Sequence, residues 1–337
     1  MVTIRELAKA TGYSVTTVSR ALNGYTDISK KAKKIIFEKA KEMGYYPNSS
    51  ARSLVTRRSY TIGVVFEEKT KVGITHPFFI HVLNNFKKYI EKRGYDILLI
   101  SKQVGDQVNS YLDHCRQKNI DGILILISHT KGEGIEQLLE SEIPSVIIDF
   151  DTDKSNCVYT NNYKSSYQSV KYLIDKGHKK IGYIHGDLSN FSGIERMKGY
   201  QKAMEDHDLP INKLHVFPGY GYSYDEGYHT GLQVANMINR PTALCCASDG
   251  LAIGFMRAMA ENHIHIPNEI SVVGFDDIDL AKYVYPGLTT IRQDTEELAI
   301  HSANILLEEI DKKKTRNTTT VIEGSLIERG SVRDLNE

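Results

Sequence analysis

Three charged residues, Asp149, Arg196 and Asp276, have the types and positions needed to bind a small polar ligand. Asp149 ends the apolar run PSVIID, Asp276 ends ISVVGFD, and Arg196 lies in the helix expected after KIGYIHGD. Open parallel sheets bind ligands at the carboxyl ends of their strands, so we expect these side chains at one site. Two carboxylates and a guanidinium can bind vicinal hydroxyls, such as those of a sugar.

Aromatic side chains could complete such a site by stacking on the apolar face of a sugar ring. The candidates are Phe78, Phe79 and Tyr222. A purely structural role stays open for Asp276, which can order its own turn. The pattern therefore predicts a pocket without naming its ligand.

No arrangement of residues predicts catalysis. The sequence has no G-x-S-x-G elbow, no P-loop, and no strand followed by G-x-G-x-x-G. His263 and His265 stand two residues apart without a nearby cysteine, which is a weak metal pattern. We therefore expect no enzyme, no metal and no cofactor.

The elements that must position these residues are apolar strands that alternate with helices. From Thr61 onward the apolar runs are TIGVVF, YDILLIS, GILILI, PSVIID, KIGYIHG, ALCCAS and ISVVGF. Continuous apolar strands separated by helical patterns indicate parallel sheets covered on both faces. The number of runs predicts two sheets in series, and hence an α/β body of two lobes.

Residues 3 to 24, TIRELAKATGYSVTTVSRALNG, predict two short helices broken at Gly12. Thr3 and Glu6 can form a capping box on the first helix, and Ser14 can cap the second. The second helix leaves four side chains on or near its outer face, namely Val15, Thr16, Ser19 and Arg20.

A third amphipathic helix is expected from Lys30 to Met43, capped by Ser29 and ended by Gly44. Its inner face is predicted to hold Ala32, Ile35, Ile36, Ala40 and Met43. Three short helices of this kind form an all-α helix-turn-helix domain that can enter DNA. A small helical bundle with a solvated polar face is the alternative.

Charge separates this head from the rest of the chain. Residues 1 to 58 hold twelve Lys and Arg against four acids, a net charge of +8. Since the whole chain has 42 of each sign, the remaining residues carry −8. A basic head of this kind is the electrostatic footprint of phosphate binding, so we expect double-stranded DNA as a partner.

Five segments occur in a characteristic order: a head ending in TVSRALNG, the linker YYPNSSARSL, GHKKIGYIHG followed by ERMKGY, the run ISVVGFDD, and LTTIRQD. In this combination the chain resembles the LacI/GalR (lactose-repressor/galactose-repressor) family over nearly its whole length. The resemblance implies a homodimer on a palindromic DNA operator, with a body like that of periplasmic binding proteins.

The resemblance also implies domain boundaries. They are a helix-turn-helix domain at 1–47, a hinge helix or linker at 48–59, and an effector-binding and dimerisation body at 60–330. The first lobe would span about 60–159 and 291–319, and the second about 160–290 and 320–330. In the family the hinge helix pairs with its dimer mate in the minor groove and inserts a leucine, here Leu54, whereas a flexible linker is the alternative.

Positions that match the family's base-reading residues are Val15, Thr16 and Arg20. Arg20 suits a bidentate contact with guanine, whereas Val15 and Thr16 suit thymine methyls or small hydrogen bonds. The other expected DNA contacts are Thr3, Ser14, Thr17, Ser19, Asn23, Ser29, Tyr45, Asn48, Ala51 and Leu54. For several of the hydroxyl and amide side chains, phosphate binding and helix capping stay equally open.

Positions that match the family's effector contacts are Asp149, Arg196, Tyr222, Ser248, Asp249 and Asp276, beside the aromatic candidates Phe78 and Phe79. Asp249 can instead cap the helix expected from Gly250. The implied function is a repressor of sugar-utilisation genes that leaves its operator when a small sugar binds. The alternative is corepression, in which a small ligand or a phosphoprotein strengthens DNA binding; a sugar-binding transport protein would explain the body alone.

Location follows from what the sequence lacks. No segment reaches the ~18 uninterrupted apolar residues of a membrane span, and the N-terminus has no run like a signal peptide. The cysteines Cys115, Cys157, Cys245 and Cys246 show no metal spacing and are expected as buried thiols. We therefore expect a cytoplasmic protein without membrane contact.

Overall fold

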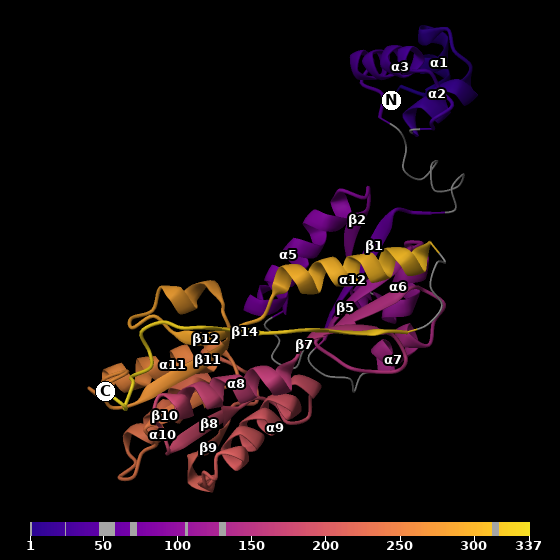
Figure 1. The fold of residues 1–337 in the computed structure, drawn as a ribbon. Coiled ribbons are helices and arrows are strands. Elements are labelled where there is room, and N and C mark those ends of the chain that lie inside the picture. The colour runs from indigo at the N-terminus through magenta and orange to yellow at the C-terminus, as the bar shows by residue number, and fades with distance from the viewer. Residues whose placement is uncertain are drawn as a thin grey trace. The chain divides into compact units, whose positions relative to one another are not determined.

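In a computed structural model of the chain, residues 2–23, 25–46, 58–67, 73–104, 107–127, 133–311 and 317–337 are described. The chain divides into two compact units, a head at Met1–Tyr60 and a body at Thr61–Glu337 (Figure 1).

The head consists of the helices α1 (Ile4–Thr11), α2 (Val15–Leu22) and α3 (Lys30–Glu42). Leu7, Val18 and Ile36, one from each helix, are fully buried together. Gly12 ends α1 with a φ of +72°, a left-handed conformation that favours glycine. The predicted helix-turn-helix domain is thus confirmed, with its turn at the predicted residue.

The inner face of α3 differs in part from the expectation. Ala32, Ile36 and Ala40 are buried as predicted, but Ile35 is exposed and Met43 is only half-buried. Successive helical residues point about 100° apart, so Ile35 cannot share the inward direction of Ile36. The prediction for Ile35 was wrong, and α3 ends one residue earlier than expected, at Glu42.

The first lobe is built on a sheet of order β13-β7-β6-β5-β1-β2 in which every pair is parallel. Its strands are β1 (Thr61–Glu67), β2 (Asp96–Ile100), β5 (Gly122–Ile127), β6 (Ser145–Ile148), β7 (Asn156–Thr160) and β13 (Thr319–Ile322). Its helices are η1 (Gly73–Thr75), α5 (Pro77–Glu91), α6 (Tyr111–Gln117), α7 (Glu133–Leu139) and α12 (Thr295–Ile310). A small hairpin, β3 (Gln103–Val104) with β4 (Gln107–Val108), follows β2.

The second lobe is built on a sheet of order β14-β12-β11-β10-β8-β9, parallel except where β14 joins β12. Its strands are β8 (Ile181–His185), β9 (Val216–Pro218), β10 (Ala243–Cys246), β11 (Ser271–Asp276), β12 (Thr289–Arg292) and β14 (Ser325–Ile327). Its helices are α8 (Asn162–Asp175), α9 (Phe191–Asp206), η2 (Lys213–His215), α10 (Tyr224–Ala235), α11 (Asp249–Glu261) and η3 (Asp279–Lys282). The α/β body of two parallel-sheet lobes is therefore confirmed.

The chain passes between the two sheets three times, after Thr160, after Arg292 and after Ile322. The second and third passages follow β12 and β13, so they fall a few residues later than the boundaries at 290/291 and 319/320. Each lobe is consequently made from separate stretches of sequence.

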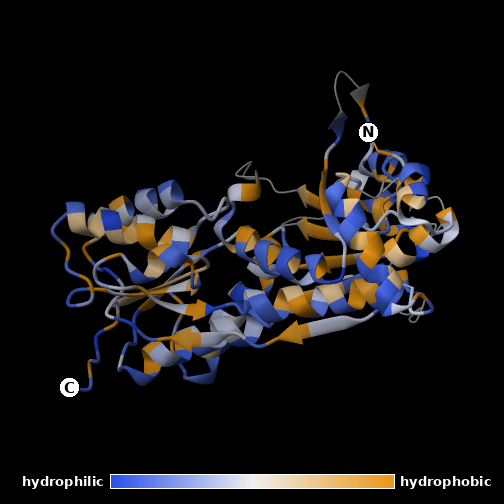
Figure 2. Ribbon diagram, turned by 90° about the horizontal axis from the view of Figure 1, so that it is seen from above, coloured by the Kyte–Doolittle hydropathy of each residue, from blue (hydrophilic) through white to orange (hydrophobic). Residues whose placement is uncertain are grey.

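Apolar strands form the centre of each lobe. In Figure 2 the strands of the body are mostly orange, whereas the helices alternate orange with blue. In the second lobe, the rings of Tyr183 and Tyr200 stack at 4.8 Å within a large buried cluster. The four cysteines are buried free thiols. Within the described part of the chain, no helix is long and apolar enough to cross a membrane.

Candidate functional site

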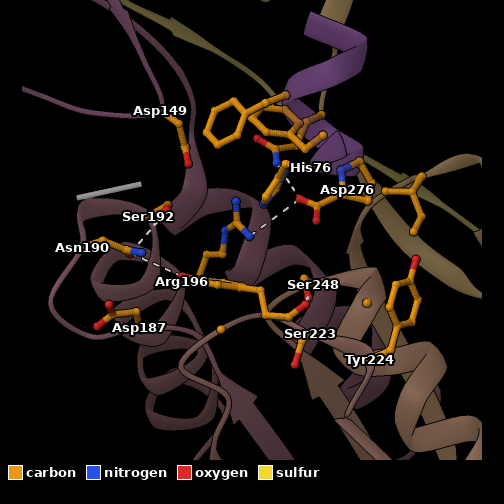
Figure 3. A pocket seen from close by; sticks show the side chains of 18 of the residues that line it. His76, Asp149, Asp187, Asn190, Ser192, Arg196, Ser223, Tyr224, Ser248 and Asp276 are labelled. Atoms are coloured by element: carbon orange, nitrogen blue, oxygen red, sulfur yellow. Dashed lines mark hydrogen bonds and ion pairs between the residues drawn. The ribbon is translucent and has the colours of Figure 1, made fainter. Parts of the chain in front are cut away.

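A cavity of about 450 Å³ opens in the body where strands of both sheets end (Figure 3). The first lobe contributes the start of α5 and the residue after β6. The second lobe contributes the loops after β8 and β9 and the residues that end or follow β10, β11 and β12. The cavity thus lies at the carboxyl ends of parallel strands, as the rule for open α/β sheets predicts.

The structure brings most of the expected effector residues to this cavity. The lining includes Phe78, Phe79, Asp149, Arg196, Tyr222, Ser248 and Asp276. Asp249 alone of the expected set is not part of it.

Asp249 is buried behind the cavity wall, with no exposed surface. Its carboxylate accepts hydrogen bonds from the Thr290 hydroxyl and from the backbone N–H of Ile278, the latter at 2.9 Å. Burial raises the pKa of Asp249 well above its ordinary value. The expectation that Asp249 contacts the ligand is therefore corrected. Asp249 begins α11 after its cap Ser248, and it ties α11 to the turn after β11.

Arg196 is the central cation of the cavity and is only 4% exposed. Its Nε donates to Asn162 Oδ1 at 2.7 Å, and one terminal nitrogen donates to the Ala247 carbonyl at 2.6 Å. The guanidinium carbon lies 3.8 Å from the centre of the Phe275 ring, and the same terminal nitrogen is 3.8 Å from Asp276 Oδ1. Contacts on several sides therefore fix the position of this side chain.

The two predicted acids are held in backbone conformations that L-residues rarely adopt. Asp149 has a φ of +64° and Asp276 a φ of +118°. Such conformations are costly and cluster at functional sites. Gln293 supports Asp276 by donating from Nε2 to Oδ1 at 2.7 Å. The backbone strain thus coincides with the carboxylates that face the cavity.

Burial changes the protonation of both acids. It raises the pKa of Asp149, against the opposing charge of Arg196. It also raises the pKa of Asp276 to about 7, although Arg196 and the Gln293 hydrogen bond both oppose the rise. Near neutral pH, Asp276 can therefore either accept or donate a hydrogen bond to a ligand.

Aromatic rings form two walls of the cavity. Phe78 and Phe79 are nearly fully buried, with ring centres 5.0 Å apart. Tyr222 has a φ of +55°, and its hydroxyl donates to Asn190 Oδ1 at 3.3 Å. A side chain at Gly186 would collide with the Tyr222 ring, so glycine there lets the ring lie flat against the backbone. All three predicted aromatic residues are thus at the cavity.

Further lining residues were missed by the sequence reasoning. They are Thr75, His76, Pro77, Asp187, Asn190, Ser192, Tyr220, Gly221, Ser223, Tyr224, Gly250, Ile278 and Gln293. Gln293 lies inside the segment LTTIRQD, and Asn190 precedes α9 as its cap. Both positions could therefore have been predicted from the sequence. The others lie mostly in loops, where sequence gives little indication of direction.

The head carries the second expected site. Val15 and Thr16 are exposed at the start of α2, and the Arg20 side chain is 45% exposed. Arg20 pairs with Asp27 Oδ2 at 2.6 Å, and its guanidinium lies 5.0 Å from the centre of the Tyr25 ring. The three expected base-reading side chains therefore lie together on the outer part of one helix.

Several expected phosphate contacts act as helix caps in the free protein. Thr3 and Glu6 form the predicted capping box, and their hydrogen bonds lower the pKa of Glu6. Ser14 Oγ accepts from the Thr17 N–H at 3.0 Å, and Ser29 Oγ accepts from the Ala32 N–H at 3.2 Å. These side chains thus hold the ends of α1, α2 and α3.

The remaining head positions differ in setting. Asn23 Nδ2 donates to the Ser19 carbonyl at 2.9 Å, and Tyr45 is half-buried against the head core. Asn48, Ala51 and Leu54 lie outside the described residues. Among the residues that are described, no group of three or more His, Cys, Asp or Glu could hold a metal ion.

Known domains match both units of the chain. Residues 3–48 match the domain described as "Bacterial regulatory proteins, lacI family". Residues 170–332 match the "Periplasmic binding protein-like domain".

Whole-chain relatives extend this match. The HTH-type transcriptional repressor PurR of Actinobacillus pleuropneumoniae serotype 3 is 30% identical over 342 residues, covering 100% of both chains. The transcriptional regulator CelR–cellobiose complex is 25% identical, with a TM-score of 0.72 over 98% of this chain and 100% of that one. A LacI family regulator from Enterococcus faecium with bound ribose is also 25% identical, with a TM-score of 0.70 over 82% and 99%.

A helix-turn-helix head joined to a two-lobed body with a polar cavity defines a ligand-responsive, DNA-binding transcriptional regulator and not an enzyme. The chain belongs to the LacI family of bacterial regulatory proteins.

Proposed function

We propose that the chain represses sugar-utilisation genes as a homodimer and is released from a palindromic operator when a small sugar enters the cavity. The observation that carries this proposal is the placement of Arg196 between Asp149 and Asp276, the latter paired with it at 3.8 Å, inside a cavity with aromatic walls (Figure 3). Charged groups of both signs bind ring hydroxyls, and aromatic faces bind the apolar side of a sugar. Two solved relatives are named as complexes with cellobiose and with ribose, which supports this ligand class.

Operator reading is proposed for the exposed part of α2. Arg20 would contact guanine through two of its guanidinium nitrogens, while Val15 and Thr16 would contact neighbouring base edges. The hydroxyl and amide groups at the helix starts could bind phosphate while they cap. This assignment is supported by exposure of the three side chains and by the basic charge of residues 1–58.

Coupling between ligand and operator is proposed to run through the segment joining the two units. We assign residues 1–47 to the DNA-binding domain, 48–59 to a hinge and 60–330 to the sensor. Leu54 would enter the minor groove between paired hinges, as the family resemblance implies. Because linkage is reciprocal, operator must weaken sugar binding by the factor by which sugar weakens operator binding. Because such a regulator must reach DNA, we propose that the chain acts in the cytoplasm.

The test is a fluorescence anisotropy titration of the full chain against the DNA upstream of its own gene. Preference for that DNA over a scrambled duplex at physiological salt is expected, as is release on adding the right sugar. A ligand that tightens the complex instead would replace induction by corepression. Lack of any preference between the two duplexes would overturn the proposal.

A further inference from the structure

The lining of the cavity has more acidic than basic side chains. Among its described residues, the carboxylates Asp149, Asp187 and Asp276 are present with one guanidinium, Arg196. Two nitrogens of Arg196 already donate to Asn162 and Ala247, and its charge is shared between two of the acids. A phosphate or carboxylate on the ligand would therefore meet like charges with no Lys and no second Arg among the described lining residues to balance them.

Backbone N–H groups at helix starts are the other common binding sites for phosphate. At the starts of α9 and α11, a side-chain acceptor of the chain already occupies one of these groups. Asn190 Oδ1 accepts from the Gly193 N–H at 2.7 Å at the start of α9, and Ser248 Oγ accepts from the Leu251 N–H at 3.2 Å at the start of α11.

The start of α10 shows the same arrangement with a full charge. The Glu226 carboxylate accepts from the Gly221 N–H at 2.8 Å and from the Ser223 N–H at 3.1 Å. The helix α5 begins with Pro77, which has no N–H to donate, so its first turn offers one donor fewer, although no side chain caps it.

The cavity instead offers acceptors to donating hydroxyls. Gln293 is 3% exposed, and its Oε1 has no hydrogen-bond partner within the part of the chain that is described. Its Nε2 donates to Asp276, so this amide orients one of the carboxylates that face the cavity. Uncharged ligands rich in hydroxyls satisfy such a lining.

The polar groups lie on two sides of Arg196. Figure 3 shows Asp149, Asn190 and Ser192 on one side and Asp276 and Tyr224 on the other. The volume of about 450 Å³ lies in the range of about 300–1,000 Å³ that small-molecule sites occupy. Each side of the cavity thus has its own polar groups, so each of two linked sugar rings would meet its own set.

We propose that the effector is an uncharged disaccharide and that the cavity rejects phosphorylated sugars. This inference rests on the proposed function, because it specifies the sugar that releases the operator. Asp187, half-buried in the loop after β8, contributes to the rejection through its charge. The effector is then a sugar that has not yet been phosphorylated by a sugar kinase or in a phosphotransfer step.

The test is calorimetric titration of the full chain with matched pairs. The probes are trehalose, sucrose, maltose and cellobiose, the 6-phosphates of the first three, and glucose and fructose. We expect at least one neutral disaccharide to bind about 100-fold more tightly than its phosphate and about 10-fold more tightly than its monosaccharides. A phosphorylated sugar or a monosaccharide that binds equally well would overturn the proposal.

Asp187→Asn supplies a second measurement that does not depend on finding the natural effector. Removing this charge should narrow the ratio of the affinities for a neutral sugar and for its phosphate by about 10-fold, whatever its effect on the neutral sugar. If this ratio of affinities does not change, the charge of Asp187 does not contribute to the rejection of phosphorylated sugars.

Operator release separates this inference from the proposed function. Each sugar that binds is added to the complex of the chain with operator DNA. If a phosphorylated sugar releases the operator, the proposal of an uncharged effector is wrong, but the chain remains a sugar-induced repressor. If the chain binds operator and neither class of sugar releases it, both proposals are wrong.

Discussion

Asp27 holds Arg20 in place on the outer surface of the head, with the carboxylate 2.6 Å from a guanidinium nitrogen and the Tyr25 ring beneath the same group. Both side chains of the ion pair are about half exposed, so the pair is worth little to stability. Its effect is to limit where the guanidinium can point before DNA arrives. The pair also brings a negative charge to a surface that is otherwise basic.

Arg20→Ala should abolish preference for operator while leaving weak, salt-sensitive binding to any duplex. A bidentate contact with guanine discriminates by about 1–3 kcal/mol, which is lost with the side chain. Arg20→Lys is the matched control, because it keeps the charge without the planar fork. The measurement is anisotropy with operator and scrambled DNA at several salt concentrations. Unchanged discrimination in Arg20→Ala would exclude the residue from base reading.

Asp27→Asn should raise affinity for scrambled DNA and reduce discrimination, because it removes a negative charge near phosphate and releases Arg20. The salt dependence should steepen by about one counterion. Glu38→Gln is the control, since it removes an exposed negative charge of the head that does not pair with Arg20. Equal effects of the two variants would show that charge alone matters and that the orientation of Arg20 does not.

Asp276→Asn should weaken sugar binding by about 10- to 100-fold, the value of a hydrogen bond to a charged group, and leave operator affinity unchanged. Asp249→Asn should leave sugar binding unchanged and destabilise the fold. It removes a buried acceptor that serves Thr290 and Ile278, so the free energy of unfolding should fall by about 1–3 kcal/mol. Calorimetry with sugar and denaturant unfolding measure the two effects. Weakened sugar binding by folded Asp249→Asn would return that residue to the ligand site.

Sugar affinity should rise with pH and level off above about pH 7, because burial raises the pKa of Asp276 to about 7. A hydroxyl that donates to this carboxylate must displace its proton, so affinity should fall about tenfold per pH unit below the pKa. Titrations in two buffers of different ionisation enthalpy would detect the released proton. Asp276→Asn should remove the dependence, and its persistence would assign it to another group.

The stability of the protein without sugar should instead fall as pH rises. A pKa raised from 3.8 to about 7 means that the folded state holds more protons than the unfolded state between these values. The contribution of Asp276 to the free energy of unfolding is therefore lost as pH rises through this window.

Gly186→Ala should displace the Tyr222 ring, because the added methyl would occupy the position of that ring. Overpacking of this kind costs about 1–3 kcal/mol, which would appear as sugar affinity about tenfold weaker. Gly287→Ala is the control, since its methyl would make ordinary contact with Arg329 away from the cavity. Crystals or Tyr222 solvent exposure would report the ring position. Normal sugar affinity in Gly186→Ala would show that the ring is not part of the binding wall.

The sequence indicated those strands that are continuous apolar runs, such as GILILI and ISVVGF, because burial on both faces leaves a strong signal. It did not indicate β7, β12 or β13, whose segments NCVYT, TTIR and TTVI mix polar and apolar residues. These strands lie beside the passages between lobes. Their pairing depends on contacts far away in sequence, which local pattern does not contain.

The site was predictable where a charged residue ends an apolar strand, as Asp149 and Asp276 do. Ser248 and Asp249 show the limit of this reasoning. They are neighbours, but Ser248 lines the cavity as the cap of α11 while Asp249 points into the core. Which of the two side chains points into the cavity depends on the residue at which α11 begins. Residues such as His76 and Asp187 reach the cavity only through the paths of their loops.

The last strands have a consequence for synthesis on the ribosome. β13 and β14 are consecutive, yet β13 is the edge strand of one sheet and β14 that of the other. Neither sheet can acquire its full set of strands until translation has passed these residues, whereas α1, α2 and α3 emerge first. A premature stop codon just before β13 would therefore release a nascent product with an intact operator reader and an unfinished sensor.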